Sequence, residues 1–285
     1  MKKVFSLIGI ATIISLSFIL SEKTEMVLKN IDTIMSELKE NQKKYETEPI
    51  SAIIENDTII PGLNGKKINI EKTYKEMKKI GEFNEKYLIY DEIKPEKTID
   101  NQYNKYIISG NQKKNQISLI FIILENDNIS NIKNILDKTN TKATFFINEK
   151  WFKKNRKLAL KLIEENHTIG VLSTKSDEDY NKILSINNII KKLGKQKTNY
   201  CYTQEKEEIQ IKRCELQQNY TIIPNIIVKK TPLSEIKQQI KPGALISLPI
   251  TNKVNNELEL IIEYIKTKGY NIENLESHLS EKNSN

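Results

Sequence analysis

Short apolar runs alternate with amphipathic segments along the second half of the chain. The run from Leu119 to Leu124 is apolar throughout, as expected for a strand that is buried on both faces. The segments between such runs space their apolar residues by three and four, which is typical of helices that cover a sheet. This alternation predicts an α/β fold, a distorted (β/α) barrel around a mostly parallel sheet. The predicted strands are 117–124, 142–147, 168–172, 198–202, 220–224, 244–248 and 269–272, and the predicted helices are 129–136, 151–163, 179–193 and 257–265.

The N-terminus has a different pattern. Lys2 and Lys3 precede an uncharged apolar run from Val4 to Leu20, which reaches the lower limit of length for a helix that spans a bilayer. A cleaved signal peptide is the alternative, but no Ala-x-Ala site follows the run. We therefore expect residues 1–22 to form a signal anchor, a transmembrane helix that holds the chain in the cell membrane through residues 4–20. The two lysines would stay in the cytoplasm, leaving the C-terminal domain extracytoplasmic in a single-pass topology.

A second periodic segment follows the apolar run. Leu28, Ile31, Met35 and Leu38 repeat at alternating spacings of three and four, with charged residues between them. The repeat covers about two heptads, which is too short for a stable coiled coil. It predicts a juxtamembrane helical stalk over residues 23–50.

Residues 51–110 are predicted to form a small α/β module. Two apolar runs flank Asn64-Gly65, a dipeptide typical of two-residue hairpin turns, and this predicts a hairpin over residues 58–70. A helix face follows over residues 70–80 and ends at Gly81. Two further strands are predicted at 87–93 and 105–108. The remaining domain, residues 111–285, contains the predicted barrel.

Composition and net charge add little to the predicted fold but bear on the choice of partners. The net charge of +8 arises from 45 basic and 37 acidic residues, and the basic residues are almost all lysines interleaved with acids. No patch of arginine and aromatic residues and no nucleic-acid-binding motif occurs, so we expect no nucleic-acid partner. Outside a membrane, the positive charge favours an anionic wall polymer as a partner. A simple bias in composition is the favoured interpretation, because the lysines are scattered and interleaved with acids rather than clustered.

The chain has two cysteines, Cys201 and Cys214. In an exported domain, an even number of cysteines favours a disulfide over free thiols. A bridge between them would close a loop of about a dozen residues and stabilise the fold by about 3 kcal/mol in the chain-entropy model. Two unpaired buried thiols are the alternative.

A family resemblance is carried by several motifs in the predicted barrel. In order and spacing they are similar to those of the polysaccharide deacetylase (NodB-homology) family of carbohydrate esterases, and the similarity extends from about Gln116 to Leu279. The resemblance implies the same distorted barrel. The motifs are Ile117 to Ile123, Lys142 to Ile147, Asn166-His167-Thr168-Ile169-Gly170, Lys241 to Leu248, and Lys268 to Ile272.

The resemblance also locates the family's catalytic positions. The family binds a divalent metal with one Asp and two His, and a second Asp acts as general base. The two Asp positions fall on Ile122 and Ile123, the two His ligands on Leu172 and Ser176, and the late catalytic His on Pro249. Together these side chains offer a single neutral hydroxyl, whereas a catalytic zinc site needs three protein ligands. The resemblance therefore implies a degenerate member with no catalytic residues, no metal and no cofactor.

Other residues were considered as replacements for the lost site. Carboxylates follow the first predicted barrel strand at Glu125 and Asp127, and others follow the third at 177–179; such a cluster could bind Ca²⁺ or Mg²⁺, although solvated loop ends are more common. His167 matches a family histidine that is not a ligand, which indicates a structural role. Tyr200, Tyr202 and Trp151 could offer stacking surfaces for sugar rings, although aromatic residues in strands and helices usually belong to the core.

The leading functional prediction is a pseudoenzyme, a cell-envelope scaffold or glycan-binding module with an inactive polysaccharide deacetylase-like domain. One alternative is a diverged hydrolase that acts on C–N bonds of cell-wall polysaccharide. Another is a protein-interaction regulator of an active deacetylase, with a second envelope protein as its partner.

Overall fold

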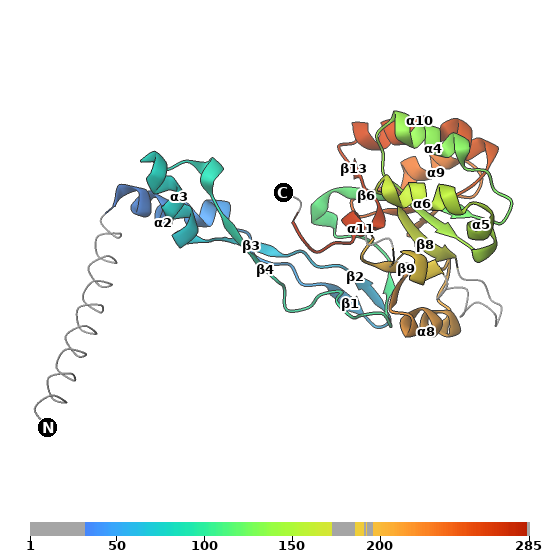
Figure 1. Cartoon of the computed structure of the whole chain (residues 1–285), viewed down its shortest axis with the longest axis horizontal. Helices are drawn as coiled ribbons and strands as arrows, with labels where there is room; N and C mark the ends of the chain where they lie inside the picture. The colour runs from blue at the N-terminus through green and yellow to red at the C-terminus, as the bar shows by residue number, and fades with distance from the viewer. Residues whose placement is uncertain (1–31, 173–185, 191, 193–195, 284–285) are drawn as a thin grey trace, which may run out of the picture. The chain divides into compact units, whose positions relative to one another are not determined.

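The structure, a computed structural model, describes residues 32–172, 186–190, 192 and 196–283. The chain divides into two compact units (Figure 1). The first comprises Met1–Pro49 and Asn64–Lys94, and the second comprises Ile50–Leu63 and Pro95–Asn285. This division differs from the predicted one, because residues 51–110 do not form a single module. The two ends of that stretch supply strands to the sheet of the second unit, and only its middle belongs to the first.

The first unit packs two helices beside a two-stranded sheet. Met35 and Leu38 are buried together with Tyr74 and Met77 in one apolar cluster, so the second part of the predicted stalk is a packed helix rather than an isolated one. The helix predicted over residues 70–80 is present and ends at Gly81, which has a φ of 82°. The elements are α2 (Thr33–Tyr45), β3 (Gly65–Ile68), α3 (Ile70–Ile80), the 3-10 helix η1 (Glu85–Tyr87) and β4 (Tyr90–Ile93).

The hairpin predicted around Asn64-Gly65 is wrong. β3 pairs antiparallel with β4, and the preceding strand β2 (Thr58–Ile60) pairs antiparallel with β1 (Ile53–Glu55). A Cβ added at Gly65 would lie 2.5 Å from the Thr47 carbonyl oxygen, so this glycine permits a close backbone approach instead of a hairpin turn. The actual turn contains Asn56, whose φ of 51° lies in the left-handed region.

The second unit contains one large curled sheet. The sheet path runs from β1 to β11 without pairing these two strands to each other, so the predicted barrel is an open, curled α/β sheet. All seven predicted strands are present, and the short strand β11 was not predicted. The strand order is β1-β2-β5-β10-β9-β8-β7-β6-β12-β11, with β13 also paired to β6. The strands are β5 (Tyr106–Ile107), β6 (Gln116–Ile123), β7 (Thr144–Ile147), β8 (Thr168–Leu172), β9 (Asn199–Tyr202), β10 (Asn219–Ile222), β11 (Ile226–Ile227), β12 (Leu245–Pro249) and β13 (Asn271–Ile272).

The curled sheet has two differently packed faces. On the outer face, Phe121 and Phe145 belong to the large cluster shared with the helices, and on the inner face Ile120, Phe146 and Tyr202 form a second cluster. Leu275 belongs to the inner cluster, and its backbone N–H donates to Thr144 Oγ1 at the start of β7. The helices are η2 (Gln112–Lys114), α4 (Ser130–Lys138), α5 (Glu149–Lys154), α6 (Arg156–Glu164), α8 (Glu208–Leu216), α9 (Pro232–Gln239), α10 (Asn252–Thr267) and α11 (Leu275–His278), and residues 186–190 are also helical.

Within the described residues, no helix combines the length and the apolar composition that crossing a bilayer requires. The predicted anchor, residues 1–22, lies outside the described residues, as do the first part of the predicted stalk and most of the helix predicted at 179–193.

Candidate functional site

The C-terminal ends of the central parallel strands carry the positions at which the family's metal site would lie, and we call this region the mouth. Pro249 ends β12 and pairs with Ile122 of β6, which in turn pairs with Phe146 of β7. Leu172 ends β8 and packs partly buried against the inner cluster. Among these described positions no side chain offers an oxygen, nitrogen or sulfur ligand, and Ser176 lies outside the described residues. The residues present do not fit a catalytic metal.

Ile122 and Ile123 point to opposite faces of the sheet. Ile122 is partly buried against the inner cluster, whereas Ile123 is fully buried in the outer cluster beneath the helices. Strand pairing continues through Ile123, which lies opposite Ile147, so the alternation of side chains continues to the end of β6. Of the two isoleucines, only Ile122 therefore faces the inner side of the mouth.

The inner face below the mouth is filled by an aromatic side chain. Phe146 is fully buried, and its ring centroid lies 5.3 Å from that of Tyr202. A Cβ added at Gly170 would lie 2.2 Å from Phe146 Cε1, so the absence of a side chain at Gly170 makes room for the ring. Tyr202 and Ser247 share a hydrogen bond of 2.8 Å between their hydroxyl oxygens. The Phe146 ring and the hydrogen-bonded pair of Tyr202 and Ser247 therefore fill the inner face below the mouth.

The three aromatic residues considered as sugar-stacking surfaces belong to the core. Tyr200 and Tyr202 are each 3% exposed and Trp151 is 1% exposed. The Trp151 indole N–H donates to the Asp127 carbonyl oxygen at 2.9 Å, and burial raises the pKa of the Tyr202 hydroxyl. None of the three can stack on a sugar ring, so this prediction is wrong. An aromatic side chain on the buried face of a strand or helix packs into the core, because removing its apolar surface from water is favourable, as it is for an aliphatic side chain.

The carboxylates that follow β6 are already engaged. Glu125 forms ion pairs with Lys150 and Lys154, at 3.3 Å and 2.9 Å, and the hydrogen bond from Lys154 is the largest influence that lowers the pKa of its carboxyl. Asp127 accepts a hydrogen bond from the Leu124 backbone N–H at 2.7 Å. Residues 177–179 lie outside the described residues. Asp127 therefore caps a loop and Glu125 pairs with lysines. Both behave as solvated residues at the end of a strand and not as ligands of a Ca²⁺ or Mg²⁺ site.

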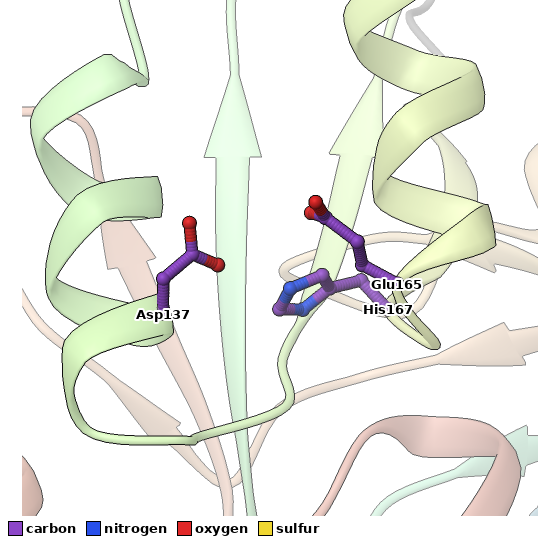
Figure 2. Close-up of side chains that lie close together, drawn as sticks. All are labelled: Asp137, Glu165 and His167. Carbon is purple, nitrogen blue, oxygen red and sulfur yellow. The ribbon is translucent and has the colours of Figure 1, made fainter.

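Asp137, Glu165 and His167 lie close together near the start of β8 (Figure 2), with ligand atoms within 4.8 Å of one another. Lys133 occupies the cationic position between the carboxylates, because its ammonium lies 2.6 Å from Asp137 Oδ2 and 2.8 Å from Glu165 Oε2. His167 Nδ1 accepts a hydrogen bond from the Ala143 backbone N–H at 3.1 Å, which places the proton of the neutral ring on Nε2. Neither ring nitrogen then presents a free lone pair, and the cluster is an ion-pair network rather than a metal site.

His167 and His278 are both buried and neutral. Burial lowers the pKa of His167 to about 4 and that of His278 to about 3. The Ser118 hydroxyl lies 2.7 Å from the Glu273 carbonyl oxygen and 2.8 Å from His278 Nδ1. A carbonyl can only accept, so Ser118 donates to Glu273 and His278 Nδ1–H donates to Ser118. Ser118 is fully buried and its proton is directed away from the imidazole, so this pair is not a nucleophile with its base.

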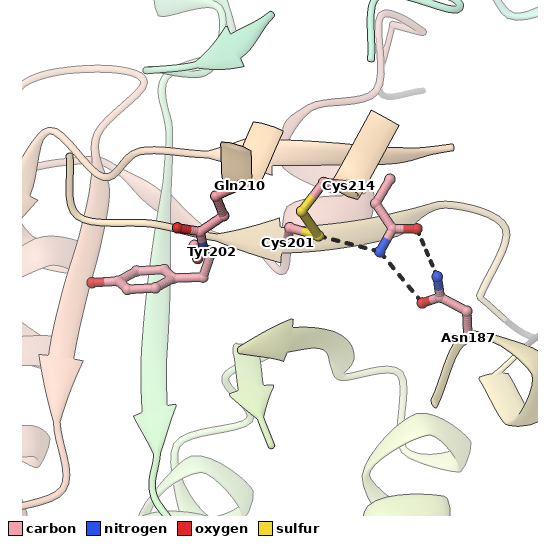
Figure 3. The surroundings of a disulfide bond; sticks show 6 residues. Asn187, Cys201, Tyr202, Gln210 and Cys214 are labelled. Atoms are coloured by element: carbon pink, nitrogen blue, oxygen red, sulfur yellow. Dashed lines mark hydrogen bonds between the residues drawn. A yellow bond between two sulfur atoms is a disulfide. The ribbon is translucent and has the colours of Figure 1, made fainter. Parts of the chain in front are cut away.

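A disulfide joins Cys201 of β9 to Cys214 of α8, with 6.2 Å between their Cα atoms (Figure 3). Both cysteines are fully buried in the outer cluster. The Asn219 amide donates to Cys201 Sγ at 3.5 Å and exchanges hydrogen bonds with Asn187. The bridge therefore attaches α8 to the strand that it covers.

Comparison with known proteins shows which family and which proteins this chain is similar to. Residues 109–232 match the sequence profile of the family described as polysaccharide deacetylase. The curated Bacillus subtilis (strain 168) protein called "Uncharacterized protein YlxY" is 35% identical over 153 residues, which are 53% of this chain and 48% of that protein. The chain therefore matches about half the length of this relative.

Three solved structures illustrate the structural similarity. Wild-type BA3943 from Bacillus anthracis, described as a CE4 family pseudoenzyme, is 26% identical with a TM-score of 0.68, covering 89% of this chain and 97% of that chain. A BA3943 mutant described as having restored enzymatic activity has a TM-score of 0.69 at 26% identity, covering 89% and 100%. The Bc1960 peptidoglycan N-acetylglucosamine deacetylase is 22% identical with a TM-score of 0.54, covering 62% and 95%, and this similarity concerns the fold alone.

Proposed function

We propose that the second unit is a degenerate polysaccharide deacetylase domain that acts as a non-catalytic cell-envelope module and binds glycan or wall polymer. The observation that carries the proposal is the mouth, where Ile122, Leu172 and Pro249 replace ligands with apolar side chains. Deacetylation in this family needs a metal to polarise the acetyl carbonyl and activate water. A deacetylase-like fold whose described mouth positions offer no ligand for that metal supports a binding role over a catalytic one.

We further propose that the chain is anchored in the cell membrane through residues 4–20, with both compact units outside the cytoplasm. The apolar run after Lys2-Lys3 supports this topology. The Cys201–Cys214 disulfide supports an oxidising compartment, since such bonds are rare in the cytosol. Fractionation of cells and protease treatment of intact cells would test this topology. Recovery of the chain in the soluble fraction, with a new N-terminus after the apolar run, would contradict the anchor.

Glycan binding can be tested by retention of the detergent-solubilised full chain on purified cell wall. The net charge of +8 could by itself hold the protein on anionic polymers, so the wall should be tested before and after their chemical removal. Binding that survives both this treatment and high salt supports glycan recognition. Binding lost with the anionic polymer supports wall-polymer affinity. Recovery of one envelope protein, without retention on wall, would instead support the regulatory alternative.

A further inference from the structure

A pocket of about 720 Å³ lies at the opposite end of the sheet from the mouth. It is lined by Asn199 at the start of β9, by Gln217 and Gln218 before β10, and by Asn188 on the helix at residues 186–190. We call it the amide pocket. Its volume falls within the range of about 300–1,000 Å³ that is typical of small-molecule sites.

The floor of the amide pocket contains the lining residues Asn187 and Gln196, whose buried side-chain amides are hydrogen-bonded. The side chains of Asn187 and Asn219 bond to each other at 2.7 Å and 3.4 Å, and Asn219 also contacts the disulfide at Cys201 (Figure 3). Gln196 uses its amide as a strand partner, accepting from the Ile169 N–H at 2.9 Å and donating to the Ile169 carbonyl oxygen at 2.8 Å. The buried amides therefore fix the position of the rim above them, as a preorganised site requires.

The rim carries the chemistry of the pocket. Within the described residues, the side-chain amides of Asn188, Asn199, Gln217 and Gln218 make no hydrogen bond, so each offers a donor and an acceptor. Lys197 is the one charged side chain among the described lining residues. The half-buried ring of Tyr103 lies 4.7 Å, between centroids, from that of Tyr220. A phosphate-bearing ligand would need several cations, which are not present here.

We propose that the amide pocket binds a neutral, N-acetylated oligosaccharide, at the end of the sheet remote from the family's catalytic position. Hydroxyl and acetamido groups each require the mixed donors and acceptors that the rim amides supply, and a sugar ring presents an apolar face to an aromatic ring such as Tyr103. This inference rests on the proposed glycan binding and locates that binding in the amide pocket. The disulfide then has a second role, because it fixes α8 and with it the rim residues that follow.

The test is a calorimetric titration of the solubilised full chain with a soluble tetramer of β-1,4-linked N-acetylglucosamine. The double variant Asn199→Ala/Gln217→Ala removes two rim amides without touching the floor. The matched control, Gln238→Ala/Asn256→Ala, removes two exposed amides from α9 and α10. Loss of two hydrogen bonds should weaken binding about tenfold in the rim variant, with no change in the control. Reduction of the disulfide should also weaken binding. Each variant is also tested for retention on purified cell wall and for its free energy of unfolding.

The outcomes separate the pocket from the proposed function. If the parent and the rim variant bind the tetramer equally, the amide pocket is not the site, whereas glycan binding stands. If the parent binds neither the tetramer nor the wall, both proposals are wrong. If the parent binds the wall but not the tetramer, an N-acetylated oligosaccharide is not the ligand of this pocket. A rim variant that binds weakly while keeping the parent's free energy of unfolding supports the assignment.

Discussion

The two ends of the curled sheet differ in chemistry. At the mouth, apolar side chains such as Ile122 and Leu172 stand where the family has ligands, and Phe146 fills the space beneath. At the opposite end, polar groups are abundant and several of them form hydrogen-bonded networks, as in the contacts of Ser118 with Glu273 and His278. The end that corresponds to the family's metal site is therefore apolar, whereas the opposite end contains polar networks. Those networks attach α11 and the loop before it to the starts of β6 and β7.

The largest expected effect comes from introducing a carboxylate at each of the two adjacent isoleucines. Ile123→Asp should destabilise the domain by about 4 kcal/mol, because an unpaired charge would be buried beneath the helices. Ile122→Asp should cost only about 1–2 kcal/mol, since that position is partly exposed on the inner face. Urea unfolding of both variants measures the difference. Ile123→Asn serves as the uncharged control of similar size, and equal losses at the two positions would contradict the assigned faces.

Lowering the pH should reduce the free energy of unfolding, because the two buried histidines must become charged on unfolding. Both imidazoles have folded-state pKa values, about 4 and about 3, below the ordinary value of 6.5, so their contribution is complete above pH 6.5 and is lost as pH falls toward those values. Each should contribute a loss of about 2 kcal/mol between pH 7.5 and pH 5. His167→Asn and His278→Asn should each flatten the pH dependence of the free energy of unfolding accordingly.

The comparison between parent and variant is the informative quantity in that experiment. Burial raises the pKa values of Glu273 and Glu276, and carboxyls of that kind gain stability as pH falls, which opposes the histidines. Subtracting the variant curve from the parent curve removes this contribution. A variant that keeps the parent's pH dependence would show that the pKa of its histidine is not lowered in the folded state.

The smallest effect concerns the ion-pair network of Lys133. Lys133→Met should cost about 1 kcal/mol, because Asp137 and Glu165 remain 48% and 30% exposed and water screens their repulsion. The matched control is Lys138→Met, which breaks an exposed ion pair with Glu259 and should change stability by roughly 0–0.5 kcal/mol. Thermal unfolding with and without millimolar Ca²⁺ or Zn²⁺ adds a second readout. Stabilisation of the parent by either cation, abolished by Asp137→Asn, would make the cluster a metal site after all.

Much of the second unit was predictable from its sequence because central parallel strands are continuous apolar runs, as in β6. Helix α8 escaped prediction because it buries Gln210 while leaving Ile209 and Leu216 exposed, so its apolar residues do not share one face. The positions that correspond to the family's ligands could be located by motif spacing. The opposite faces of Ile122 and Ile123 depend on strand pairing that continues through Ile123, and motif spacing alone does not show where a strand ends.

The polar features of the other end could not be predicted, because their parts are distant in sequence. Lys133 resembles any surface lysine until Glu165 is brought beside it. The amide pocket draws on segments near residues 188, 199 and 217, which no local pattern connects. The Cys201–Cys214 disulfide, in contrast, was the only pairing that two cysteines allow, and the structure contains it.

The central claim is that the mouth holds no catalytic metal. The most direct measurement combines metal analysis of the purified full chain with release of acetate from N-acetylglucosamine polymers, with and without added Zn²⁺ or Co²⁺. Since Ile122, Leu172 and Pro249 provide no ligand atom, we expect neither stoichiometric metal nor acetate release. One bound metal per chain, together with acetate release that depends on it, would contradict the claim.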